Sequence, residues 1–365
     1  MKISTTYPLI EEDDIQAVTD TMRSTFITQG KKTKEFEEAF AALVEKKYAV
    51  ALNSGTSANF LMFDILMRTG KLKQGDEVLT TALTWVTSVA PIVHYGLIPV
   101  FADINEDFTM KFDEKLLSPK TKAVLAVHLL GFTSKDQFPE NLIKIEDSCE
   151  SVGSKNCGYG LMTSYSFFAS HHITTAEGGM LTTDDKSIYE MARKLREFGR
   201  AYPGQGGTTN FLFDYLGFNY KYTDLQASLG LSQLKKFKRY LAQRHANARV
   251  LSVNLSTYKS LHVPKYNEKD SWFAFPIVVK HDAPFSVQSF REHLDTHGVE
   301  TRSIMCGNIL DQKCATGMKF RSGDLSTTEH FARNGFLISC GHAYKEGEMQ
   351  YIADTVKKFM DQKGA

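Results

Sequence analysis

Two adjacent histidines are the leading candidates for catalysis in this chain, because of their residue type and the sequence around them. His171 and His172 follow small and aromatic residues at 164–170 and precede an acidic glycine turn at 177–179. We predict a strand that ends at the histidines and a second short strand at 180–183. Polar groups at a strand end beside a glycine turn are typical of sites where α/β enzymes carry out reactions, and an imidazole can take up and return a proton near neutral pH. The alternative is a surface turn with two solvated histidines, because histidine is often only structural.

A second candidate site is the turn at residues 53–57, which reads Asn-Ser-Gly-Thr-Ser. It follows a predicted strand at 48–52 and precedes a predicted apolar helix at 58–67. Free backbone N–H groups and the helix dipole at such a junction favour a phosphate group. The turn is not a P-loop, because it lacks the Gly-Lys-Ser/Thr ending, and the alternative is an ordinary N-cap by Ser54 or Thr56. The candidate phosphate-binding residues are Gly55, Thr56 and Ser57.

Three further residues complete a set that suits pyridoxal phosphate (PLP). This cofactor needs an anion site for its phosphate, a flat surface for its ring, a carboxylate that keeps the ring nitrogen protonated, and a base. Trp85 could supply the flat surface, Asp147 the carboxylate, and Glu150 a contact to the ring hydroxyl. Each residue also has a structural interpretation: a core aromatic for Trp85, a helix N-cap for Asp147, and a capping-box acid for Glu150.

Alternating strands and helices are expected to bring these residues together. Predicted strands lie at 77–80, 97–102, 122–128 and 142–147, and a predicted helix lies at 85–95. Such alternation indicates βαβ units and a mostly parallel sheet. Ligands of such sheets bind at the carboxyl ends of the strands. The residues expected at that edge are the turn at 53–57, Trp85, Asp147 and His171.

A long predicted helix from Leu225 towards Val250 separates two parts of the chain. We place the domain boundary within it, so that residues 1–244 form a large α/β cofactor-binding domain and residues 245–365 a smaller α+β domain. Before this helix, a loop at 199–210 is rich in Gly, Thr and Tyr. The remaining predicted helices lie at 11–18, 33–44, 186–198, 286–297 and 346–360, and the remaining strands at 272–280, 299–304 and 336–339.

Composition excludes several classes of protein. The 365 residues carry a formal net charge of +1, with 42% hydrophobic and 23% charged residues, which is ordinary for a globular protein with a large core. This charge gives no reason to expect nucleic acid as a partner. No apolar run approaches the roughly 20 residues of a membrane span, and the N-terminus does not read as a signal peptide. The five cysteines form no C-x-x-C pair, so we expect no disulfide framework, no metal site and a cytoplasmic location.

Four segments together resemble the DegT/DnrJ/EryC1/StrS family. They are Asn53–Ser57, Glu146-Asp147, Ser166-Phe-Phe with Glu177-Gly-Gly-Met, and Gly217-Phe-Asn-Tyr-Lys-Tyr-Thr-Asp-Leu-Gln-Ala, in the family's order over most of the chain. The family consists of PLP-dependent nucleotide-sugar aminotransferases of fold type I, the aspartate aminotransferase-like fold. The resemblance implies that Ser166 binds the cofactor phosphate. It also implies a homodimer in which Asn219 reaches the phosphate of the neighbouring subunit.

One position departs from the family pattern. Where the family has a lysine that holds the cofactor covalently, five residues after the serine, this chain has His171. Histidine cannot form a Schiff base with an aldehyde, so lysine-anchored catalysis is excluded. A similar His-His-Ile-Thr-Thr segment characterises a branch of 3-dehydratases that act on nucleotide-linked 4-keto-6-deoxy sugars. The resemblance therefore implies that His171 is the catalytic base, and that it could also protonate the leaving C3 hydroxyl.

The branch contains two kinds of enzyme. One carries an iron–sulfur cluster and needs a reductase; the other has no cluster, takes its amino group from glutamate and acts on GDP-4-keto-6-deoxymannose. The cluster cysteines of the first kind lie partly in a C-x-C after a Gly-Arg pair, whereas here Gly199-Arg200 is followed by no cysteine until Cys306. We therefore expect PLP and its amino form, pyridoxamine phosphate (PMP), without a cluster. L-glutamate is the expected amino donor, and the dideoxysugars of lipopolysaccharide O-antigen are the expected destination.

Three residues are weaker candidates for substrate binding. The segments 300–302 and 307–308 resemble a part of the family near the substrate pocket. Arg302 could bind a substrate phosphate or the glutamate carboxylate, or it could be a surface charge on a strand; Asn308 is the other candidate of these segments. His172 could orient His171 or point away from it.

Three other functions remain open from the sequence. The chain could be a sugar aminotransferase with His171 as its base, which would yield an amino sugar. It could be a non-catalytic cofactor-binding homologue, or a cluster-free dehydrase that depends on a reductase and not on glutamate.

Overall fold

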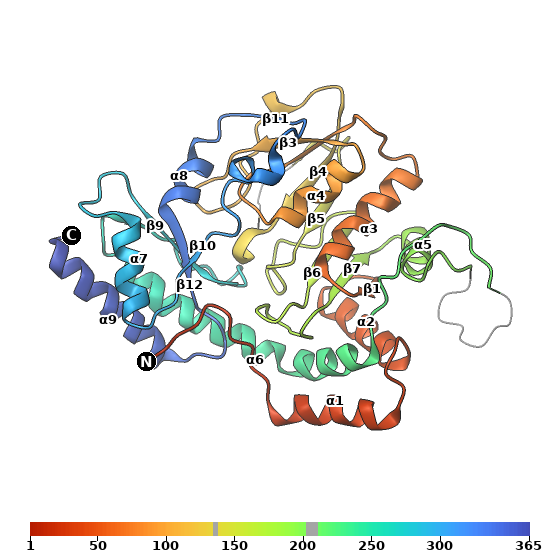
Figure 1. Ribbon diagram of the computed structural model, residues 1–365, viewed down its shortest axis with the longest axis horizontal. Coiled ribbons are helices and arrows are strands. Elements are labelled where there is room, and N and C mark those ends of the chain that lie inside the picture. The colour runs from red at the N-terminus through yellow and green to blue at the C-terminus, as the bar shows by residue number, and fades with distance from the viewer. Residues whose placement is uncertain (134–137, 202–210) are drawn as a thin grey trace.

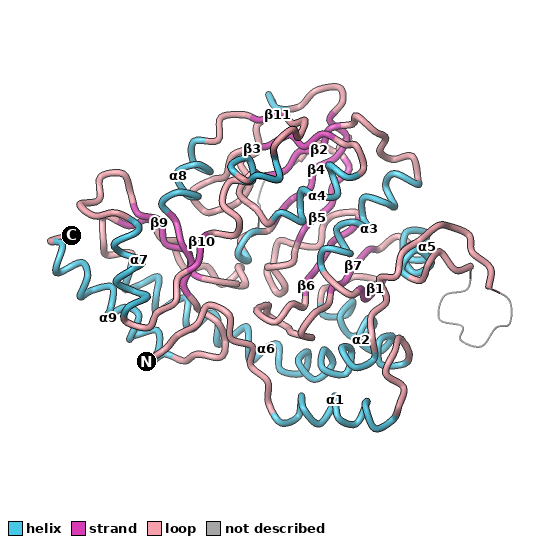
Figure 2. The backbone as a smooth tube through the Cα atoms, viewed as in Figure 1, coloured by secondary structure: helices cyan, strands magenta, loops and turns pink. Residues whose placement is uncertain are grey.

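The computed structural model describes residues 1–133, 138–201 and 211–365. Most of the loop expected at 199–210 lies outside the described residues. Two groups of strands are visible, one large and one small (Figure 2), and helices pack around both (Figure 1). Within the described residues, no helix is long and apolar enough to cross a membrane.

The large sheet has the strand order β1-β7-β6-β5-β4-β2-β3-β11. Its central strands β3, β2, β4, β5 and β6 run parallel, whereas β7 is antiparallel to both β1 and β6. The sheet is therefore mostly parallel, as the alternation of the sequence predicts. Its strands are β1 (Tyr48–Leu52), β2 (Glu77–Thr81), β3 (Ile98–Ala102), β4 (Thr121–Val127), β5 (Ile143–Asp147), β6 (Met162–Ser166), β7 (Gly179–Thr183) and β11 (Arg321–Ser322).

Both faces of this sheet are buried. Alternate residues of a strand point to opposite faces, so Val50 and Leu52 pack with α3 in one apolar cluster, while Ala49 and Ala51 pack with α2 and α6 in another. This explains why these strands read as continuous apolar runs. The helices of this part are α1 (Glu12–Ser24), α2 (Lys31–Leu43), α3 (Gly55–Arg68), α4 (Val86–His94), α5 (Lys186–Arg196) and α6 (Asp224–Leu255).

The second sheet is antiparallel and has the order β10-β12-β9-β8. It packs with its helices and the C-terminal half of α6 in a separate apolar cluster. A domain boundary near residue 245 would fall inside the continuous helix α6 and stays a prediction. The elements of this part are β8 (Leu261–His262), β9 (Phe275–Val279), α7 (Val287–Thr296), β10 (Arg302–Ser303), α8 (Ser326–Asn334), β12 (Gly335–Ile338) and α9 (Glu346–Lys363).

Several elements differ from expectation. The strand predicted to end at the histidines, β6, ends at Ser166, so His171 and His172 lie in the loop that follows it. The two-residue strands β8 and β11 match no predicted element. Helix α3 begins at Gly55 and not at 58, because the Ser54 side chain accepts a hydrogen bond from the Ser57 N–H and draws the turn into the first helical turn. Strand β10 covers only two of the six residues predicted at 299–304, since Val299 bridges to Ile3 instead. The polar helix α8 was not predicted.

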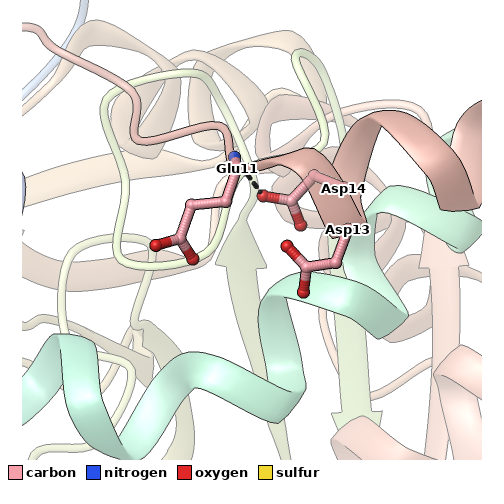
Figure 3. A group of neighbouring side chains, drawn as sticks. All are labelled: Glu11, Asp13 and Asp14. Atoms are coloured by element: carbon pink, nitrogen blue, oxygen red, sulfur yellow. Dashed lines mark hydrogen bonds between the residues drawn. The ribbon is translucent and has the colours of Figure 1, made fainter.

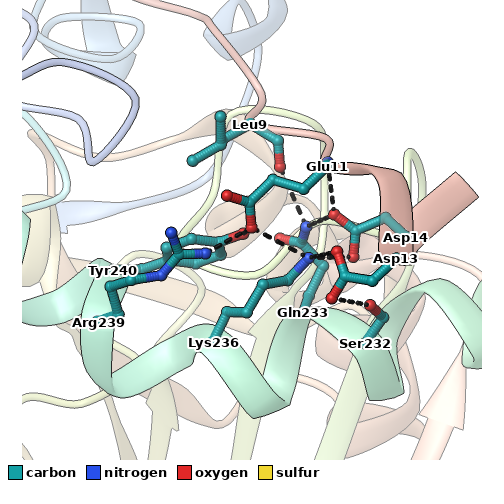
Figure 4. A network of polar contacts seen from close by, with 9 residues as sticks. All are labelled: Leu9, Glu11, Asp13, Asp14, Ser232, Gln233, Lys236, Arg239 and Tyr240. Atoms are coloured by element: carbon teal, nitrogen blue, oxygen red, sulfur yellow. Dashed lines mark hydrogen bonds and ion pairs between the residues drawn. The ribbon is translucent and has the colours of Figure 1, made fainter.

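The N-terminal helix α1 is fastened to α6 by charge. The carboxylates of Glu11, Asp13 and Asp14 gather at its start (Figure 3). The ammonium of Lys236 lies 3.3, 2.8 and 2.7 Å from oxygens of these three carboxylates, respectively (Figure 4). The side chains of Asp14 and Lys236 are almost fully buried, so this pairing supplies the charge compensation that buried ions require.

Candidate active site

One cavity of about 690 Å³ collects most of the predicted site residues. Its lining includes residues at the carboxyl ends of the large-sheet strands and in the loops that follow them, and also residues of the second sheet and of α7. Of the candidates, Gly55, Thr56, Trp85, Asp147, Glu150, Ser166, His171 and Arg302 line it, whereas Ser57, His172, Asn219 and Asn308 do not. Within the described part of the chain, no lysine is among the lining residues.

The N-terminus of α3 lines the cavity and is suited to bind an anion. The first N–H groups of a helix have no partner within the helix, and here Ser54, Gly55 and Thr56 line the cavity together with Ser166. A Cβ on Gly55 would lie 2.9 Å from both Cys149 Sγ and Ser166 Cβ, so only glycine fits this approach of α3 to β6. Ser57 is turned away: its hydroxyl donates to Asn53 Oδ1 at 2.6 Å.

The Asp147 carboxylate ends β5 and is fixed by two helices. Its Oδ2 accepts hydrogen bonds from Asn59 Nδ2 of α3 at 2.8 Å and from Ser88 Oγ of α4 at 2.7 Å. Its Oδ1 accepts a longer bond, 3.2 Å, from the Cys149 N–H. The arrangement holds one acceptor oxygen rigidly while the other is less committed, which suits a carboxylate that binds a protonated ring nitrogen.

Trp85 stands at the N-terminus of α4 and is 52% exposed. An indole this exposed has no core neighbours on much of its surface. Trp85 lines the cavity and is not a core residue, so the interpretation as a core aromatic does not fit.

His171 has one ring nitrogen fixed and the other free for chemistry. Its Nδ1 lies 2.7 Å from the Cys149 carbonyl oxygen. A carbonyl oxygen only accepts, so Nδ1 carries the proton and Nε2 keeps its lone pair. The ring of Phe273 packs beside it at 4.9 Å between centroids. Burial lowers the pKa of His171 to about 4, and so the imidazole is a neutral base at neutral pH.

Glu150 lies beside Asp147 in the same cavity. Burial, and to a lesser degree the charge of Asp147, raise the pKa of Glu150 to about 8, although the Leu130 N–H donates to its Oε2 at 2.7 Å. At neutral pH it is therefore mostly a protonated carboxylic acid, which can donate a hydrogen bond as well as accept one.

The remaining candidates lie away from the cavity or at its rim. His172 is buried behind His171, and its Nε2 donates to the Ser271 carbonyl oxygen at 2.9 Å. Asn308 is buried at a turn, where its side chain accepts from the Leu310 N–H. Asn219 is exposed and accepts from Lys221 Nζ at 2.6 Å. Arg302 lines the cavity but is 55% exposed and pairs with Glu300 at 3.0 Å.

Sequence reasoning missed several lining or supporting residues. Asn59 and Ser88 stand inside apolar helices, and a lone polar residue on the buried face of such a helix could have identified them. Phe273, Arg291 and Thr5 line the cavity from segments that no motif marks.

The residues fit pyridoxal phosphate. A side-chain-free glycine leaves room at the α3 N-terminus, a supported carboxylate stands at the end of β5, and an exposed indole lines the same cavity. These are the three requirements of the cofactor for its phosphate, its ring nitrogen and its ring face. The fourth position, the base, is His171.

The profile of the DegT/DnrJ/EryC1/StrS aminotransferase family matches residues 8–357. The chain belongs to this family. It is 32% identical to GDP-4-keto-6-deoxy-D-mannose 3-dehydratase of Escherichia coli O55:H7, over 97% of this chain and 98% of that protein. It is also 32% identical to the protein of the same name from Yersinia pseudotuberculosis, over 98% of this chain and 100% of that protein.

The fold is similar to that of solved relatives. A crystal structure of GDP-4-keto-6-deoxymannose-3-dehydratase with a trapped PLP–glutamate geminal diamine has a TM-score of 0.90 and 28% sequence identity, and the match covers 97% of this chain and 100% of that one. These findings confirm the family and the aspartate aminotransferase-like fold class that the motifs implied.

Proposed function

We propose that this chain is a PLP/PMP-dependent 3-dehydratase of a nucleotide-linked 4-keto-6-deoxyhexose, with L-glutamate as amino donor. GDP-4-keto-6-deoxymannose is the proposed substrate, because two relatives that match nearly the whole chain at 32% identity are named as 3-dehydratases of that sugar. The observation that carries the proposal is His171, a neutral imidazole whose Nε2 has no hydrogen-bond partner among the described residues, in a cavity that none of the described lysines lines.

Bound pyridoxal phosphate supplies an electron sink and a carrier for the amino group of glutamate. The chain's own residues do the rest. Asp147 holds the ring nitrogen protonated, Trp85 covers a ring face, and Ser166 with the α3 N-terminus binds the phosphate. His171 takes a proton on Nε2 and returns it to the leaving C3 hydroxyl, a base-then-acid sequence for which a single imidazole suffices.

The overall reaction balances without an external reductant. Glutamate loses two electrons and its amino group and becomes 2-oxoglutarate, while the sugar loses its C3 oxygen and gains hydrogen there. The products are a 4-keto-3,6-dideoxy sugar, 2-oxoglutarate and ammonia. No iron–sulfur cluster is required for this balance, and none is proposed.

The proposal extends to the assembly and its setting. The active unit is a homodimer in which Asn219, exposed on one subunit, reaches the cofactor phosphate of the other. The enzyme works in the cytoplasm, in the biosynthesis of dideoxysugars for lipopolysaccharide O-antigen, and neither nucleic acid nor a membrane takes part.

Mass spectrometry of the sugar product tests the proposal. The protein is incubated with PLP, glutamate and GDP-, CDP- or dTDP-linked 4-keto-6-deoxyhexose. A product that lacks one oxygen, with ammonia released, supports the dehydratase and identifies the nucleotide. An amino sugar would make the chain an aminotransferase. Turnover with a reductase but without glutamate would favour the reductase-coupled alternative, and failure of glutamate alone to convert PLP would favour a non-catalytic homologue.

A further inference from the structure

Two arginines line the same cavity as Asp147, and they differ in what they already bind. They are the only lysine or arginine side chains among the described lining residues. Arg302 is mostly exposed and its Nε donates to Glu300. Arg291, on α7, is partly buried, and among the described residues no carboxylate oxygen lies within 4.0 Å of its guanidinium nitrogens.

Arg291 is held in place through its inner nitrogen only. Its Nε donates to Thr301 Oγ1 at 3.0 Å. Thr301 in turn is fixed by Asp295, whose two carboxylate oxygens accept from the Thr301 N–H at 2.8 Å and from its hydroxyl at 3.2 Å. Arg291 and Asp295 lie one turn apart on α7, so the helix fixes the positions of both residues that contact Thr301.

Among the described residues, neither terminal nitrogen of Arg291 has a hydrogen-bond partner on the protein, while the Nε contact restricts the orientation of the guanidinium plane. A guanidinium oriented in this way can donate two parallel hydrogen bonds to one oxyanion. Asp147 and Arg291 line the same cavity, so it offers both a carboxylate for a cationic ring nitrogen and a guanidinium for an anion. A buried or half-buried arginine without an anion is otherwise unfavourable.

We propose that Arg291 is the oxyanion anchor of this cavity, oriented by Thr301 and Asp295. The ligand group is either a carboxylate of the amino donor or a phosphate of the sugar nucleotide; both present paired oxygens to the guanidinium. The choice between these two sources rests on the proposed function, whereas the anion site itself does not.

Isothermal titration of the full-length, PLP-loaded protein with glutarate and, separately, with GDP tests the site. In Arg291→Gln we expect a loss of affinity of about 10- to 100-fold for one of the two probes, because a charge-assisted bidentate contact is lost. Loss for glutarate assigns the amino-donor carboxylate, and loss for GDP assigns the phosphate. Arg291→Lys should bind this probe more tightly than Arg291→Gln and less tightly than the unmodified chain. It keeps the positive charge but cannot donate two parallel hydrogen bonds.

Two further variants separate anchoring from general damage. Thr301→Val removes the oxygen that orients Arg291, but Arg291 keeps its charge. This variant should therefore lose less affinity for the probe than Arg291→Gln does. Arg333→Gln, at an exposed arginine on α8 outside the cavity, should bind both probes as the unmodified chain does. Equal affinity of Arg291→Gln and the unmodified chain for both probes, or binding of neither probe by the unmodified chain, would overturn the proposal. The test measures binding affinity and not turnover. Its result can therefore be interpreted even if the chain proves not to be a dehydratase.

Discussion

At the scale of single residues, one hydrogen bond decides which atom of His171 can react. The Cys149 carbonyl oxygen fixes the proton on Nδ1, so the base atom is Nε2. The sequence pattern at 164–180 identifies this histidine as a candidate but does not predict its tautomer. The tautomer depends on Cys149, which lies 22 positions away in the sequence. The alternative of a surface turn with two solvated histidines fails, because His171 is half-buried beside Phe273 and His172 is fully buried.

We expect His171→Asn to lower the dehydration rate by about 10²- to 10⁴-fold, the usual contribution of a positioned acid–base group. His171→Lys should abolish dehydration and bind the cofactor covalently, so that borohydride fixes it to the protein. Rates come from product formation, and covalent attachment from the intact protein mass. His94→Asn, at an exposed histidine of α4, serves as the control. Unchanged dehydration in His171→Asn would remove His171 from the mechanism.

Glu150 contributes to stability with the opposite pH dependence from an ordinary carboxylate. Burial raises its pKa to about 8 in the folded chain, against an ordinary value of 4.5. Between these pH values the folded state keeps a proton that the unfolded state has lost, so this group makes the protein less stable as pH rises from 4.5 to 8. A glutamine at this position cannot ionise and still offers an oxygen to the Leu130 N–H.

Glu150→Gln should therefore stabilise the cofactor-free protein at pH 8, on the order of 2 kcal/mol relative to the unmodified chain, and have little effect at pH 5. Urea unfolding at both pH values measures the difference. Glu140→Gln, at an exposed position, should show no such pH-dependent gain. A gain that is equal at pH 5 and pH 8 would mean that Glu150 is ionised in the folded state.

The residues that sequence could identify are those next to a recognisable junction. Asp147 closes a predicted strand and Gly55 stands in a small-residue turn, so both could be named in advance. Asn59 and Ser88 could have been noticed as lone polar residues of apolar helices, but their role could not be predicted, because the carboxylate that they support lies 88 and 59 positions away. Arg291 could not be predicted from the sequence for a related reason: its place at the cavity depends on how the second sheet packs against the first.

At the scale of elements, the N-terminus of α3 carries the proposed phosphate site and depends on a close approach to β6. Gly55→Ala should weaken PLP binding by on the order of 1–3 kcal/mol, because the new Cβ would meet Cys149 and Ser166 at 2.9 Å and push the helix end away. Absorbance titration with PLP measures the affinity.

The matched control is Gly347→Ala in the first turn of α9. A Cβ there meets nothing within 4 Å and the backbone is helical, so the variant should bind PLP normally and gain about 0.5–1 kcal/mol of stability. If Gly55→Ala binds PLP as tightly as the unmodified chain, the α3 terminus is not the phosphate site.

Elements were predictable where one periodicity dominated. The buried strands β1 to β5 read as apolar runs because both faces of the sheet are covered, and their bounds fall within one or two residues of the prediction. Strand β10 and helix α8 were not predictable in the same way. The first is shortened by a pairing with the N-terminal residue Ile3, and the second is a polar helix whose buried face offers little more than Thr328 and Phe331.

At the scale of the whole molecule, α6 joins the two sheets. Its first half packs with α2 and the large sheet, and its second half packs with the apolar cluster of the second sheet (Figure 1). Arg244, in the second half, is buried. It donates to the carbonyl oxygens of Trp272 and Phe273 at 3.0 and 2.8 Å and to His342 Nδ1 at 3.1 Å. The segment that packs on His171 is thus held by a helix that spans both parts.

Arg244 also acts on His171 through its charge. Burial is the main cause of the low pKa of His171, and the nearby guanidinium lowers it further. Arg244→Gln should therefore raise the pKa of His171, and the acid limb of the dehydration rate should move to higher pH, because a protonated imidazole cannot act as the base. The same variant should lose about 2–4 kcal/mol of stability, since two buried carbonyl oxygens lose a charged donor.

Arg244→Lys separates these two effects, because it keeps the charge and loses the planar fork. We expect it to lose stability while its acid limb stays near that of the unmodified chain. Arg249→Gln, on the exposed face of the same helix, should change neither quantity. Thermal unfolding and rate–pH profiles measure the two quantities independently. An acid limb that moves equally in Arg244→Gln and Arg244→Lys would mean that Arg244 acts on His171 only by holding Phe273 in place, and not through its charge.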